Sequence, residues 1–438
     1  MPPCVTQRLS NGLTTAVVHR PGTHQVLVCL MVRVGSRHED PAQVGVSHFL
    51  EHLLFRGNEA FPDADALNRA FEEVGSMLGA QTGVETTEFE FLAHPERLDD
   101  GLGRLADFIR RPTFADLDKE RRILLDELAY DYNDQGSLIH LAALSSRLMW
   151  PGHPLGQNVG GLPETIDTLD TGIIQAHYRR HYRPENMVLG LAGNILPEEA
   201  FAMAQKHFGD WTPSPPEPAP APVPAPVAIP APAPTKTGPH LCLVNDTDNQ
   251  FHLQLGFAAP GYNAPEEPAM ILLTRILDDG PTSRLQRTIR EEKALVYHIS
   301  AALSAYWDAG ALEIATSVKA STFAPLLHHL LRELASIRDH GPTADELERA
   351  RMRHLFEVEF SRDSLSAQID RHVWPLLYAT PRDEETERRL IQEVRLDKVC
   401  ALAREVLAPE NLHLVLVGPL GADVDNTVRK DVEQYSAT

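Results

Sequence analysis

The residues best suited to chemistry are two histidines and a glutamate on one short run. His48, Glu51 and His52 stand at positions i, i+3 and i+4, so a helix would project all three from one face. Imidazole nitrogens bind Zn²⁺ well, and a neighbouring carboxylate can take a proton from a water molecule. The rest of the run Val46–Phe55 is mostly apolar, which predicts a buried helix. Such a helix would hold the two histidines rigidly, but a metal would need a further ligand.

A second acidic helix could supply that ligand. A His-x-x-x-His pair alone is a weak signal in a chain with 20 histidines, because it also arises by chance on a buried helix. The segment Asp116–Asn133 has helical periodicity and carries Glu120 and Glu127, two turns apart on one face. Glu120 either supports the metal site or belongs to a solvated face of its Lys-Glu-Arg-Arg run. The metal hypothesis therefore depends on the two helices lying side by side.

The length, net charge and cysteine content of the chain limit the classes of protein to which it can belong. A chain of 438 residues is too long for one core and predicts two or three domains. A net charge of −21 argues against nucleic acid as a partner, since phosphate binding needs clustered Lys and Arg. No apolar stretch is long enough to cross a membrane, and the first residues lack a signal-peptide pattern. The four scattered cysteines indicate no disulfide framework, so we expect a cytoplasmic protein.

The chain also repeats itself. The segment Pro184–Gly193 recurs as Pro409–Gly418, and the helical stretch 102–128 is echoed by 330–360. Both halves mix strand-like and helical runs, which predicts a duplicated α+β domain with mainly antiparallel sheets. Between the halves, alternating Ala and Pro predict an extended linker. The predicted division is an N-terminal metal-binding domain at 1–212, a linker at 213–238 and a homologous domain at 239–438.

The motif His48-Phe49-Leu50-Glu51-His52 is the inverted zinc motif His-x-x-Glu-His. Together with Glu127 downstream, it resembles the pitrilysin family of zinc endopeptidases, which includes insulin-degrading enzyme and the mitochondrial processing peptidases. The resemblance spans the chain and suits a short, bacterial, processing-peptidase-like branch. It rests on these further segments: Gly35 to Glu39, Gly57, His153 to Gly156, Pro184 to Gly193 and Ser283 to Tyr297.

The resemblance implies roles for the site residues. His48, His52 and Glu127 would bind one zinc ion per chain, and Glu51 would be the general base. Glu120 would support this set from the same helix as Glu127. The family fold implies a clam-like chamber in which two homologous domains enclose a peptide.

Two other regions match substrate-binding residues of the family. Arg290 and Tyr297 correspond to a pair that reaches the substrate from the second half, although Ala294 stands where relatives usually have Gly. Gly79 and Ala80 correspond to an edge strand that holds an extended peptide by main-chain hydrogen bonds, although relatives usually have Asn where this chain has Gly79. Since backbone pairing needs no side chain, we expect binding to persist with a different sequence preference.

Three functions remain open at this point. The leading hypothesis is a zinc endopeptidase acting on peptides or small unfolded polypeptides. The second is a maturation protease for a ribosomally made precursor, for example that of a quinone cofactor, working with an inactive partner subunit. The third is a non-catalytic structural subunit, against which the intact zinc motif argues. Short members of the family commonly pair two chains, so the resemblance implies a homodimer or a heterodimer with a homologous subunit.

Overall fold

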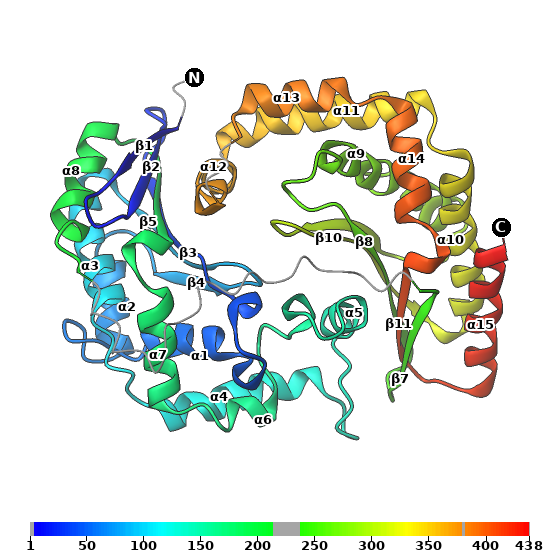
Figure 1. Ribbon diagram of the computed structural model, residues 1–438, viewed down its shortest axis with the longest axis horizontal. Helices are drawn as coiled ribbons and strands as arrows, with labels where there is room; N and C mark the ends of the chain where they lie inside the picture. The colour runs from blue at the N-terminus through cyan, green and yellow to red at the C-terminus, as the bar shows by residue number, and fades with distance from the viewer. Residues whose placement is uncertain (1–3, 213–236, 379–381, 438) are drawn as a thin grey trace. The chain divides into compact units, whose positions relative to one another are not determined.

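Eleven β-strands in the described residues form two sheets, each the centre of its own compact unit (Figure 1). The computed structural model describes residues 4–212, 237–378 and 382–437. The first unit comprises the described parts of residues 1–128, 157–227 and 358–384, and the second those of 129–156, 228–357 and 385–438. The predicted linker lies almost wholly outside the described residues, so the predicted division at that point stays a prediction.

The first sheet has the strand order β1-β2-β6-β3-β5-β4. Only the β2–β6 pair is parallel, and the other neighbours are antiparallel. Every residue of β3 and β6 is buried, as expected of central strands that are covered on both faces. The strands are β1 Val5–Arg8, β2 Thr14–His19, β3 Val26–Val32, β4 Gly79–Thr82, β5 Thr87–Ala93 and β6 Met187–Gly193.

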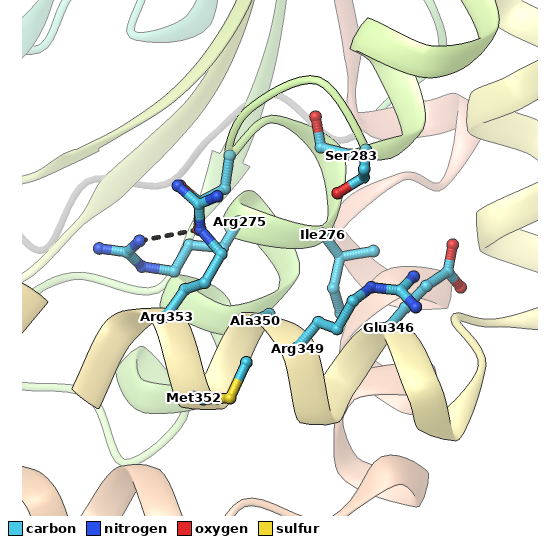
Figure 2. A pocket seen from close by; sticks show the side chains of 10 residues that line it. Arg275, Ile276, Ser283, Glu346, Arg349, Ala350, Met352 and Arg353 are labelled. Atoms are coloured by element: carbon cyan, nitrogen blue, oxygen red, sulfur yellow. Dashed lines mark hydrogen bonds and ion pairs between the residues drawn. The ribbon is translucent and has the colours of Figure 1, made fainter. Parts of the chain in front are cut away.

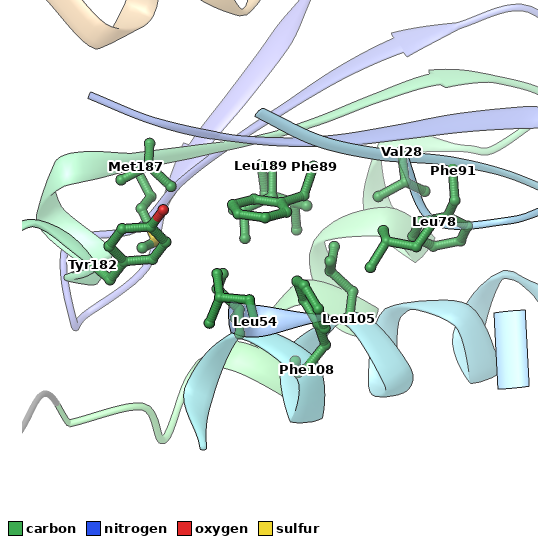
Figure 3. Packing of buried hydrophobic residues seen from close by; sticks show 14 of the residues in the cluster. Val28, Leu54, Leu78, Phe89, Phe91, Leu105, Phe108, Tyr182, Met187 and Leu189 are labelled. Carbon is green, nitrogen blue, oxygen red and sulfur yellow. The ribbon is translucent and has the colours of Figure 1, made fainter. Parts of the chain in front are cut away.

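Helices cover one face of this sheet and bury the larger part of the core of the first unit. Figure 3 shows Phe89 of β5 against Phe108 of α3, with ring centroids 5.4 Å apart in an edge-on contact. On the other face of the sheet, Ile369 and Val373 pack with Met31 in a separate cluster. The helices of this unit are α1 Val46–Leu54, α2 Ala64–Glu72, α3 Leu98–Arg110, α4 Leu117–Leu128, α6 Pro163–Ile166, α7 Thr171–His181, α8 Pro197–Phe208 and α12 Leu365–His372.

The second sheet repeats the topology of the first. Its order is β7-β11-β8-β10-β9, which matches β2-β6-β3-β5-β4 strand for strand, and its one parallel pair, β7–β11, matches β2–β6. Short 3₁₀ turns at Pro184–Asn186 and Pro409–Asn411 lead into the equivalent strands β6 and β11. The duplicated α+β architecture is therefore confirmed. The strands are β7 His240–Asn245, β8 Gln250–Ala259, β9 Ile299–Ala305, β10 Gly310–Lys319 and β11 Leu412–Gly418.

The second sheet is likewise covered on both faces. Leu144 of α5 packs with Val415 and Val417 of β11, on the face opposite the main core. Of the remaining helices of this unit, α11 ends and α13 begins with residues that belong to the first unit. The helices of this unit are α5 Leu141–Met149, α9 Glu267–Leu277, α10 Ala320–His340, α11 Ala344–Phe360, α13 Glu384–Glu393, α14 Leu396–Val406 and α15 Ala422–Ala437. Among the helices that the structure describes, none combines the length and apolarity needed to span a bilayer.

Candidate metal centre

The helix α1 presents the predicted motif on one face. Phe49, Leu50 and Leu53 are completely buried in the core of the first unit. The side chains of His48, Glu51 and His52 lie on the remaining face and are only partly buried. The apolar residues thus fix the helix against the sheet, and the polar face is left for chemistry.

The second predicted helix, α4, packs against α1. It begins at Leu117, ends at Leu128, and is followed by a short 3₁₀ turn, so the predicted helix at 116–133 was too long at its C-terminal end. The potential ligand atoms of His48, His52 and Glu127 all lie within 4.8 Å of one another. The structure therefore brings together the three residues that the motif comparison assigned to zinc.

Glu120 lies beneath this set and holds the ring of His52. Its Oε2 is 3.2 Å from Nδ1 of His52, while Nε2 of the same ring is 3.8 Å from Oε2 of Glu127. Arg56 forms an ion pair with the other oxygen of Glu120. Because the side chain of Glu120 is only 1% exposed, the solvated-face alternative is excluded. Arg56 was not predicted as a site residue, although it follows His52 at helical spacing, i+4.

Glu51 faces the edge of the sheet. The hydroxyl of Thr82, the last residue of β4, donates a hydrogen bond of 2.5 Å to Oε2 of Glu51. Burial raises the pKa of Glu51 above its ordinary value, which makes its carboxylate a stronger base. Burial also lowers the pKa of His48 to about 4, so its imidazole is neutral at pH 7, as a metal ligand must be.

The chemistry of this set fits a zinc ion. Two imidazoles and one carboxylate form a ligand type found in catalytic zinc sites that keep one position open. Nδ1 of His48 is buried and has no hydrogen-bond partner in the described part of the chain, so a ring nitrogen is left unsatisfied there. Glu120 supplies the carboxylate that commonly orients a ligating histidine. Of the residues that the structure describes, only these three form such a cluster.

The predicted peptide-binding segment is an edge strand. β4 pairs with β5 alone, at the end of the first sheet. Gly79 and Gln81 are exposed, while Ala80 and Thr82 are half-buried. An edge strand has unpaired backbone N–H and C=O groups, to which an extended peptide can add. The strand β4 therefore carries both Thr82, whose side chain bonds to Glu51, and backbone groups that an extended peptide could pair with.

Arg290 and Tyr297 lie close to each other in the second unit. Arg290 belongs to a π-helical segment, Gln286–Glu292, and its guanidinium carbon lies 5.7 Å from the ring centroid of Tyr297. The side chain of Tyr297 is 90% exposed. Between them, Ala294 has a φ of +50°, in the left-handed region that favours glycine. This conformation gives a physical reason for the Gly that relatives usually have there. The role of both residues toward a substrate stays a prediction.

The second unit also contains a small polar pocket between α9 and α11. Figure 2 shows Arg275 and Arg353 close together at one end of it, and Glu346 at the other. Both arginines bond to the carboxylate of Asp279 at 3.0 Å, and Glu346 pairs with Arg284. These four charged side chains and Arg284 are therefore paired within the unit, and we assign the pocket a structural role.

The comparisons with known proteins agree with this geometry. The Insulinase profile, peptidase family M16, matches residues 14–160, which include all the residues of the candidate metal centre. A second profile, described as the peptidase M16 inactive domain, matches residues 169–353, which include Arg290 and Tyr297. The chain belongs to the M16 family of peptidases, as the motif indicated.

Several relatives match nearly the whole chain. An uncharacterized zinc protease of Mycobacterium leprae is 30% identical over 91% of this chain and 88% of its own length. Another from Bacillus subtilis is 26% identical over 94% and 97%. Among solved structures, a protease from Helicobacter pylori has a TM-score of 0.83 at 19% identity, covering 96% of this chain and all of that one. The periplasmic protease PqqL of Escherichia coli has a TM-score of 0.79 at 19% identity, covering 100% of this chain but 50% of that one.

Proposed function

We propose that this protein is a zinc-dependent endopeptidase that cleaves peptides or small unfolded polypeptides. The observation that carries the proposal is the cluster of His48, His52 and Glu127 beside Glu51. A bound Zn²⁺ supplies Lewis acidity, which activates water and polarises the carbonyl of the scissile bond. The names of the mycobacterial and Bacillus relatives, which call them zinc proteases, support the choice of metal.

The chain's own residues perform the proton transfers and the positioning. Thr82 holds Oε2 of Glu51, so the other carboxylate oxygen takes the proton of the attacking water and returns it to the leaving amine. Glu120 keeps the ring of His52 in place and is itself held by Arg56. A peptide extended along β4 would pair with the backbone around Gly79 and Ala80, which fixes the bond to be cut.

The second unit would contribute substrate contacts. Arg290 and Tyr297 both have hydrogen-bond donors suited to a peptide carbonyl or to the oxyanion that forms from it. The chain matches the fold of the first half of PqqL, over 97% of that half. The match covers 50% of the whole E. coli chain, and the part of that chain outside the match supports a partnership of this chain with a second copy or with a homologous subunit.

A non-catalytic subunit is the second candidate, because one matching profile is described as an inactive domain. Measurements of zinc content and of peptide hydrolysis distinguish the endopeptidase from the non-catalytic subunit. We expect about one zinc per chain, cleavage of a mixed peptide library, and loss of cleavage with a chelator. Glu51→Gln should keep its zinc but cleave about 100- to 10,000-fold more slowly, because the water loses its proton acceptor.

A matched pair of variants on α4 tests the third ligand. Glu127→Gln should lose zinc, whereas Asp126→Asn, which alters an adjacent exposed carboxylate, should keep it. Full zinc occupancy in a His48→Ala/His52→Ala double variant would refute the metal assignment. A wild-type chain that holds zinc but cleaves nothing, alone or with a homologous partner, would favour the non-catalytic subunit.

A further inference from the structure

The start of α1 cannot be capped by its own residue. Gly45, at the N-cap, has a φ of +95° and no side chain to accept a hydrogen bond. A Cβ at this position would lie 2.6 Å from Cα of Gly161 and 2.8 Å from Cδ1 of Ile166. A capping Ser, Asp or Asn is therefore excluded here by both the backbone conformation and the packing.

Glu39 supplies the missing cap from outside the helix. The backbone N–H of Gly45 donates to its Oε2 at 2.7 Å, and that of Ser47 donates to its Oε1 at 2.8 Å. The first turn of α1 contains no acidic residue, and Glu39 is 5% exposed. A buried carboxylate thus faces the positive end of the helix that carries His48.

The segment that holds Glu39 is also fastened to the turn between β4 and β5. We call residues 35–39 the brace. Gly35 lies so close to this turn that a Cβ would be 2.3 Å from the carbonyl oxygen of Gly83. The N–H of Arg37 donates to the carbonyl of Val84 at 2.9 Å, and its guanidinium bonds to Glu85 at 2.6 Å. Arg37 and Glu85 are only 5% and 7% exposed, so this ion pair is shielded from solvent.

The brace therefore connects two parts of the candidate site. At one end it binds the N–H groups of Gly45 and Ser47 at the start of α1, three residues and one residue before His48. At the other end it holds the turn that follows Thr82, whose hydroxyl bonds to Glu51. Neither Glu39 nor the Arg37–Glu85 pair belongs to the ligand set, so the brace acts on that set through the helix and the hairpin.

We propose that Glu39 is a positioning residue that fixes the start of α1, and that the Arg37–Glu85 ion pair positions the β4–β5 hairpin against that helix. The consequences for zinc and peptide rest on the proposed function. Loss of the cap moves His48, a ligand, whereas loss of the ion pair moves the strand to which a peptide would add.

The first test is hydrogen exchange in the metal-free, full-length chain. Glu39→Gln keeps the shape of the side chain but removes its charge and replaces one acceptor oxygen with an NH₂ group. The matched control is Asp63→Asn, because Asp63 caps α2 by accepting from the N–H of Ala66 at 2.8 Å. Measurements at pH 8 keep Glu39 ionised, since burial raises its pKa to about 7. We expect amide exchange at residues 46–54 to rise about tenfold in Glu39→Gln only, the range expected for a lost cap.

Equal changes in exchange in both variants, or no change in Glu39→Gln, would overturn the role of Glu39. Glu39→Asp keeps the charge with a shorter reach and should fall between wild type and Glu39→Gln, which gives a second comparison if the glutamine variant folds poorly. A chain that binds no zinc would contradict the proposed function, yet the exchange experiment would still decide whether Glu39 positions α1.

The second test separates the two ends of the brace. Glu39→Gln should weaken zinc binding about tenfold in a chelator competition, whereas Glu85→Gln should leave it within about twofold of wild type. Glu85→Gln should instead raise KM for a peptide about tenfold, because the edge strand is displaced. If Glu85→Gln lost zinc and left KM unchanged, the proposed division of roles would be wrong.

Discussion

Replacement of Glu120 by Gln tests how far the candidate metal centre depends on a residue that is not itself a ligand. The carboxylate is 1% exposed, lies 3.2 Å from Nδ1 of His52, and pairs with Arg56 through its other oxygen. The variant keeps the shape but loses the charge. Replacing a partner of this kind commonly weakens metal binding about 10- to 100-fold, which corresponds to about 1.4–2.7 kcal/mol.

The same change also leaves Arg56, which is 24% exposed, without its partner. An unpaired charge at a largely buried position destabilises the fold by about 1–3 kcal/mol. Loss of zinc could then reflect unfolding rather than a misplaced His52. The double variant Glu120→Gln/Arg56→Gln removes both charges, so we expect it to be more stable than the sum of the single variants predicts, while its zinc affinity stays low.

Zinc affinity is measured by competition with a chelator, and the folded fraction by circular dichroism under the same conditions. Asp118→Asn is the control, because Asp118 is an exposed carboxylate on the same helix. The reasoning is refuted if Glu120→Gln binds zinc as tightly as wild type. It is equally refuted if Asp118→Asn weakens binding to the same extent.

Three further predictions concern the second unit. Arg290→Ala and Tyr297→Phe should each lower kcat/KM about 10- to 1,000-fold without altering zinc content, and unchanged kinetics would remove both from the proposed mechanism. Ala294→Gly should raise the free energy of unfolding in urea by about 0.5–1 kcal/mol, because φ is +50° there; a less stable variant would contradict this. His413 is fully buried and its pKa is lowered to about 4, so its stabilising effect is complete above pH 6.5 and declines as pH falls toward 4. Between pH 7.5 and 4.5 wild type should therefore lose about 2 kcal/mol more than His413→Gln, and equal losses would refute the assignment.

The sequence could predict the helices of the site because their patterns are local. The i, i+3, i+4 spacing of His48, Glu51 and His52 needs only one turn of helix. The hydrogen bond between Thr82 and Glu51 depends instead on how β4 packs against α1. The local sequence pattern contains no information on the distance between these two side chains. The same holds for Glu39, which caps a helix whose N-cap residue lies six positions beyond it. Its signal was indirect: the N-cap position of the helix is Gly45, which has no side chain to cap it.

The second unit has no counterpart of the metal cluster in its described residues, although its sheet repeats the topology of the first. In the second unit α9 precedes two antiparallel strands as α1 does in the first, but Leu272, Leu273 and Ile276 fill the core there. A helix whose faces are mostly apolar contributes stability through burial, whereas the polar face of α1 leaves His48 and Glu51 half-buried and desolvated. Burial of titratable side chains destabilises the fold, and it is expected at functional sites, where such side chains are needed for the reaction.

The compact units also differ from the sequence halves in a way that periodicity cannot reveal. An amphipathic helix has one apolar face, but its pattern does not say which sheet that face covers. The helix α5 follows α4 directly in the chain, yet it covers the second sheet. Its counterpart α12 follows α11, yet Ile369 and Val373 cover the first sheet, where a Cβ on Gly190 would be 2.5 Å from Val373. The sheet beneath the candidate metal centre thus owes its second cover to residues far beyond the predicted linker, so a chain cut at residue 212 would expose an apolar face that the intact protein buries.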